Sequence, residues 1–203
     1  MSYTFSRMGL IFLKKLTSKE LFSIPNLLSY FRILLIPVIC ILYFQAQTPK
    51  DYLFAGLVVL FSSLTDLADG FIARHFNMIT DLGKILDPVA DKLTHAAIAV
   101  CLAVHYPLMW LLIILMLFKE GYMAYMGITY LKRGKMMNGA MWYGKVCTAS
   151  LFFGLMILFC FPFIPRAVSN GIILVLMLIM AVTLCLYISF YRKLKTENSV
   201  KNL

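Results

Sequence analysis

The sequence predicts an all-α integral membrane protein with six transmembrane helices and an N-terminal amphipathic helix lying on the membrane interface. The 203 residues are 62% hydrophobic, and the mean hydropathy of +0.86 is far outside the range of soluble globular proteins. Apolar segments of about 20 residues recur along the chain, each long enough to cross ~30 Å of hydrocarbon as a helix. Little chain remains between them, so we expect one membrane domain over residues 23–193, an interfacial segment over 1–22 and a cytoplasmic tail over 194–203.

The six predicted spans follow one another with short connections. Pro25 suits the start of the first helix, and Pro37 is expected to kink it. Pro88 directly follows an Asp and fits the first turn of the third helix. The N-terminal segment mixes apolar residues with Lys, which favours an interfacial helix over a signal peptide, with a disordered leader as the alternative. The spans cover residues 25–45, 52–74, 85–106, 108–131, 142–163 and 171–191.

The net charge of +10 is distributed in a way that predicts the orientation of the spans. With six spans both termini lie on one side, and that side receives 17 of the 19 Lys and Arg residues. Only Lys50 and Arg166 fall on the other side. The positive-inside rule therefore places both termini in the cytoplasm, and it explains the basic charge by topology and anionic lipid rather than by nucleic acid.

Carboxylates are concentrated in one short window of this apolar chain. The chain has nine Asp and Glu residues, and five of them, Asp66, Asp69, Asp81, Asp87 and Asp91, lie within 26 residues. A charged side chain at membrane depth costs about 2.5–3.5 kcal/mol even on the lenient insertion scale. The window therefore marks the candidate functional site, and the positive-inside rule places it in the cytoplasm.

The spacing of the carboxylates indicates a metal site. Asp66 and Asp69 are three residues apart near the end of the second span, and Asp87 and Asp91 are four apart in the third, so each pair shares a helix face. Two antiparallel helices then bring four oxygen ligands toward one point, which suits Mg²⁺ or Mn²⁺ and allows two ions. The nearest histidine in the window, His75, falls in the connecting loop, so zinc is not indicated.

The residues between the carboxylates favour a phosphate ligand. Gly70 and Ala73 are small enough for a ligand to approach the helix backbone, and Arg74 has the forked donors that bind phosphate oxygens. Together with the metal ligands they predict a metal-bridged pyrophosphate site, although an isolated pair of Asp at a helix end is more often a cap. Arg32 lies within the first span, where it must face either a polar cavity or an ion-pair partner.

One motif carries a family resemblance. The residues Asp66-x₂-Asp69-Gly70-x₂-Ala73-Arg74-x₈-Gly83-x₃-Asp87-x₃-Asp91 match the signature of the CDP-alcohol phosphotransferase family. Within that family, the stretches SIPNLLSYFRILLIPV and WYGKVCT are similar to bacterial phosphatidylglycerophosphate synthases and CDP-dependent cardiolipin synthases. The resemblance implies six spans, a homodimer in a bacterial cell membrane, and an enzyme with two divalent ions, Mg²⁺ or Mn²⁺.

The resemblance also implies a reaction and residue roles. An alcohol attacks the β-phosphorus of CDP-diacylglycerol, and CMP leaves. Asp66, Asp69 and Asp87 would hold the two metals, and Asp91 would lie near the second metal and act as general base. The residues implied to contact the cytidine diphosphate part are Asn26, Ser29, Gly70, Ala73, Arg74, Thr80 and Gly83.

The acceptor alcohol is less well specified. A phosphorylated acceptor needs cations, for which the candidates are Lys119, Arg133, Lys135 and Lys145. The glycerophosphate enzymes usually have Arg-Glu where this chain has Lys119-Glu120. We expect sn-glycerol 3-phosphate, with phosphatidylglycerol or another alcohol as alternatives.

Two other functional classes, a membrane prenyltransferase and a cation transporter, fit the sequence less well. A membrane prenyltransferase needs two distant acidic motifs and about nine spans, whereas this chain has one compact acidic cluster and six spans. A cation transporter has no evident use for the DGxxAR sequence.

Overall fold

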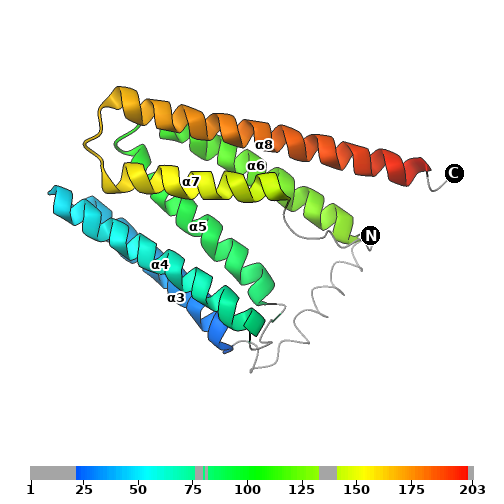
Figure 1. Cartoon of the computed structure of the whole chain (residues 1–203), viewed down its shortest axis with the longest axis horizontal. Helices are drawn as coiled ribbons and strands as arrows, with labels where there is room; N and C mark the ends of the chain where they lie inside the picture. The colour runs from blue at the N-terminus through cyan, green and yellow to red at the C-terminus, as the bar shows by residue number, and fades with distance from the viewer. Residues whose placement is uncertain (1–21, 76–79, 81, 133–140, 201–203) are drawn as a thin grey trace, which may run out of the picture. The chain divides into compact units, whose positions relative to one another are not determined.

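The computed structural model describes residues 22–75, 80, 82–132 and 141–200, and in these ranges the chain is all-helical (Figure 1). The predicted all-α class is thereby confirmed. The predicted interfacial helix falls almost entirely on residues 1–21, which lie outside the described ranges. The six helices are α3 (Ile24–Gln45), α4 (Pro49–His75), α5 (Gly83–Ala103), α6 (Met109–Lys132), α7 (Trp142–Cys160) and α8 (Arg166–Val200).

Among the described helices, all but α5 contain a stretch long and apolar enough to cross a membrane. The large apolar side chains that these helices expose, such as Leu34 and Phe118, fit contact with lipid. The exception is α5 because Asp87, Asp91 and Lys92 fall in every stretch of it that is long enough to span. Among the described helices, the one without such a stretch is therefore the one that carries Asp87 and Asp91, half of the acidic motif.

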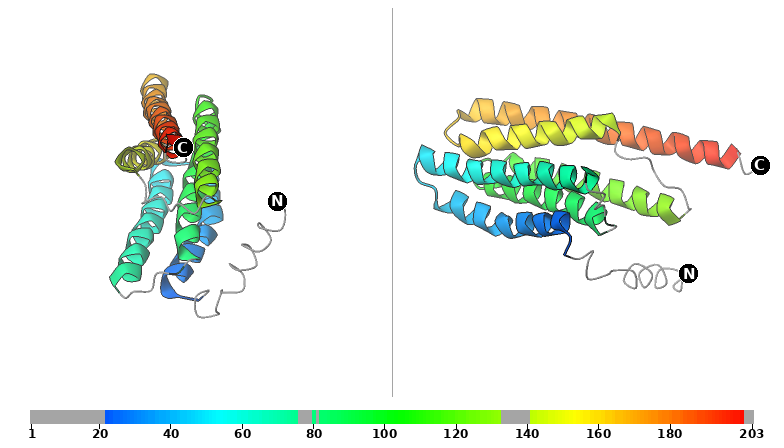
Figure 2. Two further views of the ribbon diagram at one scale, coloured as in Figure 1. Left: turned by 90° about the vertical axis from the view of Figure 1, so that its right-hand side faces the viewer. Right: turned by 60° about the horizontal axis from the view of Figure 1, so that its bottom comes forward.

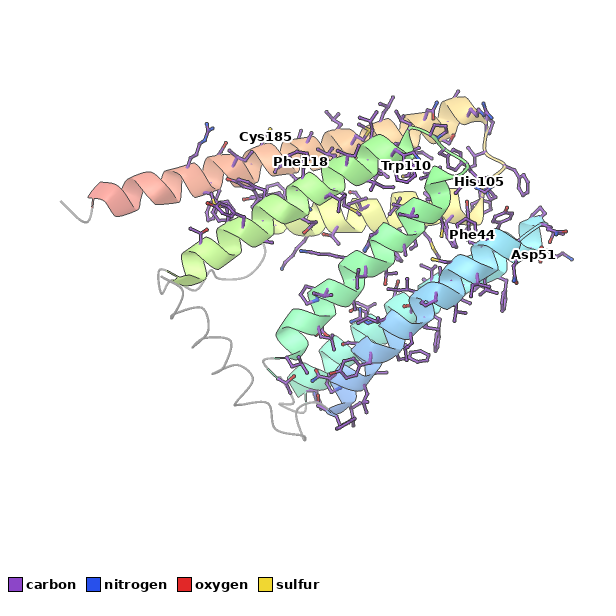
Figure 3. The ribbon with its side chains drawn as sticks, turned by 180° about the vertical axis from the view of Figure 1, so that it is seen from behind. Phe44, Asp51, His105, Trp110, Phe118 and Cys185 are labelled. Carbon is purple, nitrogen blue, oxygen red and sulfur yellow. The ribbon has the colours of Figure 1, made fainter. Side chains whose placement is uncertain are left out.

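The chain divides into two compact units, residues 1–97 and 98–203, and α5 continues across the division. In the first unit α3 and α4 run side by side as an antiparallel hairpin (Figures 1 and 2). Asp51 Oδ2 accepts the backbone N–H of Thr48 at 2.7 Å and so caps the start of α4. Tyr43 and Tyr52 pack edge to face, with ring centroids 5.3 Å apart. Figure 3 labels Asp51 at this closed end of the hairpin.

The start of α5 corrects one prediction. Pro88 does not lie in the first turn but inside the helix, which begins at Gly83. The hydroxyl of Thr80 accepts the N–H of Gly83 at 2.9 Å, so a side chain satisfies a donor that has no partner within the helix. The earlier start follows from this cap, which the proline pattern does not reveal.

In the second unit α8 packs against α6 and against the antiparallel α7 (Figure 2). α8 is helical through Val200, so the predicted tail beginning at residue 194 continues this helix. The core includes the fully buried residues Leu155 and Ile173. Gly154 allows the close approach of α7 and α8, because a Cβ at this position would lie 2.7 Å from Cδ1 of Leu176.

Gly154→Val is therefore expected to destabilise the second unit by about 1–3 kcal/mol through overpacking. Thermal unfolding of the purified protein in detergent measures the effect. Leu176→Ala in the same chain should restore part of the loss. Gly121→Val is the matched control, since a Cβ at Gly121 has no neighbour within 4 Å. Equal shifts for the two valine variants would contradict the packing argument.

Candidate active site

Three polar residues form a buried stripe on one face of α3. Asn26, Ser29 and Arg32 are spaced three residues apart, and their exposed fractions are 0%, 0% and 3%. The rest of α3 is almost entirely apolar. Buried polar groups need partners, so this stripe must face polar groups on a neighbouring helix.

Arg32 is the residue that joins the two acidic segments. Its Nη1 donates to Oδ1 of Asp66 on α4, and its Nη2 lies 3.8 Å from Oδ1 of Asp87 on α5. The Arg32 side chain is 4% exposed, whereas each carboxylate is 38% exposed. The ion pair that was one of the two expectations for Arg32 is thus observed. Arg32 lies against one oxygen atom of each carboxylate, and part of each carboxylate remains accessible to solvent.

Ser29 supplies a second contact to the same acidic group. Its hydroxyl lies 2.5 Å from Oδ1 of Asp87, a short charge-assisted hydrogen bond that a carboxylate accepts. The same oxygen of Asp87 therefore faces both Ser29 and Arg32. This places the start of α5 against the first half of α3.

Asn26, Thr80 and Gly83 form one hydrogen-bonded chain. Thr80 donates its hydroxyl to Oδ1 of Asn26 at 3.1 Å, and Gly83 donates its backbone N–H to Thr80. A Cβ on Gly83 would lie 2.7 Å from Oδ1 of Asn26, so a larger residue would force this group apart. Three of the residues that the family resemblance assigned to the nucleotide are therefore brought together by direct contacts.

Asp91 has a partner that the sequence reasoning missed. Nδ1 of His95 lies 2.8 Å from the backbone oxygen of Asp91 and 3.3 Å from its Oδ1. His95 is 7% exposed. The i, i+4 spacing of the two residues was the available signal, because such residues share a helix face. The contact restrains Asp91 on α5.

The charges of the cluster suit a divalent cation. Asp66 interacts electrostatically with the like charges of Asp87 and Asp91 as well as with Arg32. Three carboxylates and one guanidinium leave an excess of negative charge, and the donor set is made of the hard oxygen ligands that Mg²⁺ and Mn²⁺ prefer. The residues therefore fit such an ion, although no three acidic, His or Cys groups among the described residues are already arranged around one point.

Several predicted site residues have side chains outside the described part of the chain. These are Asp69, Ala73 and Arg74 on α4, and Arg133 and Lys135 beyond α6. Gly70, between the first two of these, is half-buried on α4.

Two acceptor candidates lie in the second unit, in different environments. Lys119 is 4% exposed, and its Nζ donates to Oε1 of Glu120 at 3.0 Å. Lys145, near the start of α7, is exposed. A buried cation with a carboxylate partner is strongly constrained electrostatically, which makes Lys119 the more distinctive of the two.

Most of the chain matches one family of known proteins. The family model for CDP-alcohol phosphatidyltransferases matches residues 22–188. CDP-diacylglycerol--glycerol-3-phosphate 3-phosphatidyltransferase of Rickettsia bellii is 42% identical over 80 residues, covering 39% of this chain and 44% of the relative. The protein of the same name from Escherichia coli K12 is 39% identical over 89 residues, covering 44% and 48%.

A third relative has a different printed name. The cardiolipin synthase (CMP-forming) / mitochondrial hydrolase fusion protein of Schizosaccharomyces pombe is 40% identical over 86 residues, covering 42% of this chain and 14% of the relative. The chain thus spans less than half the length of each of these relatives. The family predicted from the acidic motif is confirmed by the much longer match of the family model. Since that match takes in nearly the whole described chain, the chain belongs to the CDP-alcohol phosphatidyltransferase family.

Proposed function

We propose that this protein transfers the phosphatidyl group of CDP-diacylglycerol to sn-glycerol 3-phosphate and releases CMP. The observation that carries the proposal is the gathering of Asp66 and Asp87 on the polar face of α3, with Asp91 one turn further along α5. Family membership supports the donor chemistry. The names of the Rickettsia and Escherichia relatives support the acceptor.

The acidic residues would hold two divalent cations, Mg²⁺ or Mn²⁺. Asp66, Asp69 and Asp87 are the proposed ligands, with Asp91 near the second ion. When bound, such ions neutralise the diphosphate and stabilise charge on the leaving CMP. The partial exposure of Asp66 and Asp87 leaves oxygen atoms accessible for this role.

Asp91 is the proposed general base. It accepts the proton of the acceptor hydroxyl as that oxygen forms a bond to the β-phosphorus and the bond from phosphorus to CMP breaks. Correct placement of the carboxylate matters because proton transfer requires hydrogen-bond distance. The contact with Nδ1 of His95 restrains Asp91 for this step.

The cytidine diphosphate part would lie along the first half of α3 and the end of α4. Arg74 offers two parallel donors to a phosphate oxygen pair, and small residues leave space beside the backbone. The contacts among Asn26, Thr80 and Gly83 shape the connection that leads into α5. The full proposed set is Asn26, Ser29, Gly70, Ala73, Arg74, Thr80 and Gly83.

The acceptor phosphate would be bound by cationic side chains. Lys119 is the leading candidate because a buried ammonium attracts an anion more strongly than a solvated one. Lys145, Arg133 and Lys135 are the others. Cardiolipin synthesis, with phosphatidylglycerol as the acceptor, is the second candidate function, and the name of the Schizosaccharomyces relative favours it.

The proposed setting is a bacterial cell membrane crossed several times, with both termini and the site on the cytoplasmic side. The five described helices that are long and apolar enough to span support a multi-pass setting, and the excess of Lys and Arg on one side supports the orientation when α5 is counted as a sixth span. We propose a homodimer by analogy with the family, in contact with membrane lipid and without a nucleic-acid partner.

The acceptor is tested by supplying purified protein with CDP-diacylglycerol, Mg²⁺ or Mn²⁺, and either glycerol 3-phosphate or phosphatidylglycerol. We expect CMP release with glycerol 3-phosphate, its loss on chelation of the metal, and its return when metal is added back. Release with phosphatidylglycerol alone would show that the second candidate function is correct.

Asp91→Asn is expected to lower kcat for CMP release by about 10²–10⁴-fold, since an amide cannot accept the proton. Binding of a CDP-alcohol, followed separately, should persist. Asp51→Asn at the closed end of the hairpin is the matched control, because it makes the same change where the side chain only caps α4. Turnover near the wild-type rate in the Asp91 variant would refute the assignment of the base.

Lys119→Gln is expected to raise KM for glycerol 3-phosphate by about tenfold or more, the effect of losing one charge-assisted hydrogen bond. KM for CDP-diacylglycerol should stay close to its wild-type value. Lys50→Gln removes the same charge at an exposed site in the first turn of α4 and serves as the control. An unchanged KM for the acceptor would exclude Lys119 from the acceptor site.

A further inference from the structure

We propose that Arg32 is a positioning residue that competes with the divalent cation for Asp66 and Asp87 and so keeps the metal affinity of the site low until a diphosphate is present. The inference rests on the proposed function, because it assumes that these carboxylates are metal ligands. It goes beyond that function by assigning Arg32, which is not part of the acidic motif, a role in controlling when metal binds.

The first step of the argument is the charge state of Arg32. A guanidinium remains protonated at any working pH, so its charge is permanent. Arg32 is 3% exposed, so its charge is almost entirely shielded from solvent. A buried permanent charge needs a counterion, and here the counterions are Asp66 and Asp87.

The second step is that Arg32 lies against one oxygen atom of each carboxylate. Oδ1 of Asp66 accepts from Nη1 of Arg32, and Oδ1 of Asp87 lies near both Arg32 and the Ser29 hydroxyl. A dication bound to the same carboxylates would be held a few ångströms from a guanidinium. Two positive charges at that separation in a partly buried site repel strongly, so each weakens binding of the other.

The third step concerns the substrate. A bound diphosphate brings negative charge that stabilises both the dication and Arg32, and the repulsion between these two cations is then offset. Metal and CDP-alcohol should accordingly bind cooperatively, with Arg32 as the source of the cooperativity. A purely structural Arg32 would stabilise the helices but would leave the metal affinity unchanged.

The test is the dissociation constant of Mn²⁺, measured by electron paramagnetic resonance of the full-length protein in detergent without nucleotide. Arg32→Gln should bind Mn²⁺ at least about tenfold more tightly than wild type, because the competing charge is gone. Addition of CDP should tighten Mn²⁺ binding in wild type and do so much less in this variant. Arg32→Lys keeps the charge and should bind Mn²⁺ within about threefold of wild type.

One control variant and two further measurements support the interpretation of this experiment. Arg166→Gln makes the same charge change at an exposed residue at the start of α8 and should leave the Mn²⁺ affinity unchanged. Should Arg32→Gln unfold without metal, it can be purified in Mn²⁺ and its affinity obtained by competition with a chelator of known strength. Mn²⁺ should also raise the unfolding temperature of this variant more than that of wild type.

The outcomes separate this inference from the proposed function. An Mn²⁺ affinity in Arg32→Gln equal to or weaker than that of wild type would overturn the competition while leaving phosphatidyl transfer intact. Absence of Mn²⁺ binding in wild type would overturn both the metal assignment and this inference. Failure of wild type to release CMP, with tighter Mn²⁺ binding in Arg32→Gln, would refute the proposed function alone.

Discussion

The site depends on one buried cation held by two carboxylates from different helices. Arg32 comes from α3, Asp66 from α4 and Asp87 from α5, so one guanidinium joins three consecutive helices. Without it, the acidic ends of α4 and α5 would place like charges together in a partly buried region, where repulsion is strong. The contact also restricts the rotation of α3, because the helix must present Ser29 and Arg32 to α5 and α4 at the same time.

This arrangement offsets part of the cost of placing charged residues in a membrane protein. Each carboxylate at membrane depth costs several kcal/mol, and α5 carries enough charge to fall outside the range of an apolar span. In the first unit, the polar residues that contact the carboxylates are grouped at the open end of the α3–α4 hairpin. The closed end of the hairpin is built around Tyr43 and Tyr52. Buried polar groups at the open end bond to one another, as Asn26 does with Thr80.

The parts that could be predicted from sequence are those set by local pattern. Apolar length located the helices, and the motif identified the family, because both depend on residues close together in the chain. The start of α5 was misplaced since its cap is a hydroxyl from Thr80, whereas the prediction relied on Pro88. The partner of Arg32 could not be chosen from sequence, because pairing across helices depends on how they pack. The i, i+4 spacing of Asp91 and His95 indicates that the two residues share a helix face, but the prediction did not use this spacing.

Arg32 and Lys119, one buried basic residue from each unit, differ in the partners that their charges have. Arg32 pairs with residues on other helices, so replacing it disturbs the packing of the first unit as well as its charge. Lys119 pairs with Glu120, its immediate neighbour on α6. Replacing Lys119 would therefore remove an ion pair between neighbours on one helix, whereas replacing Arg32 would remove contacts that join three helices.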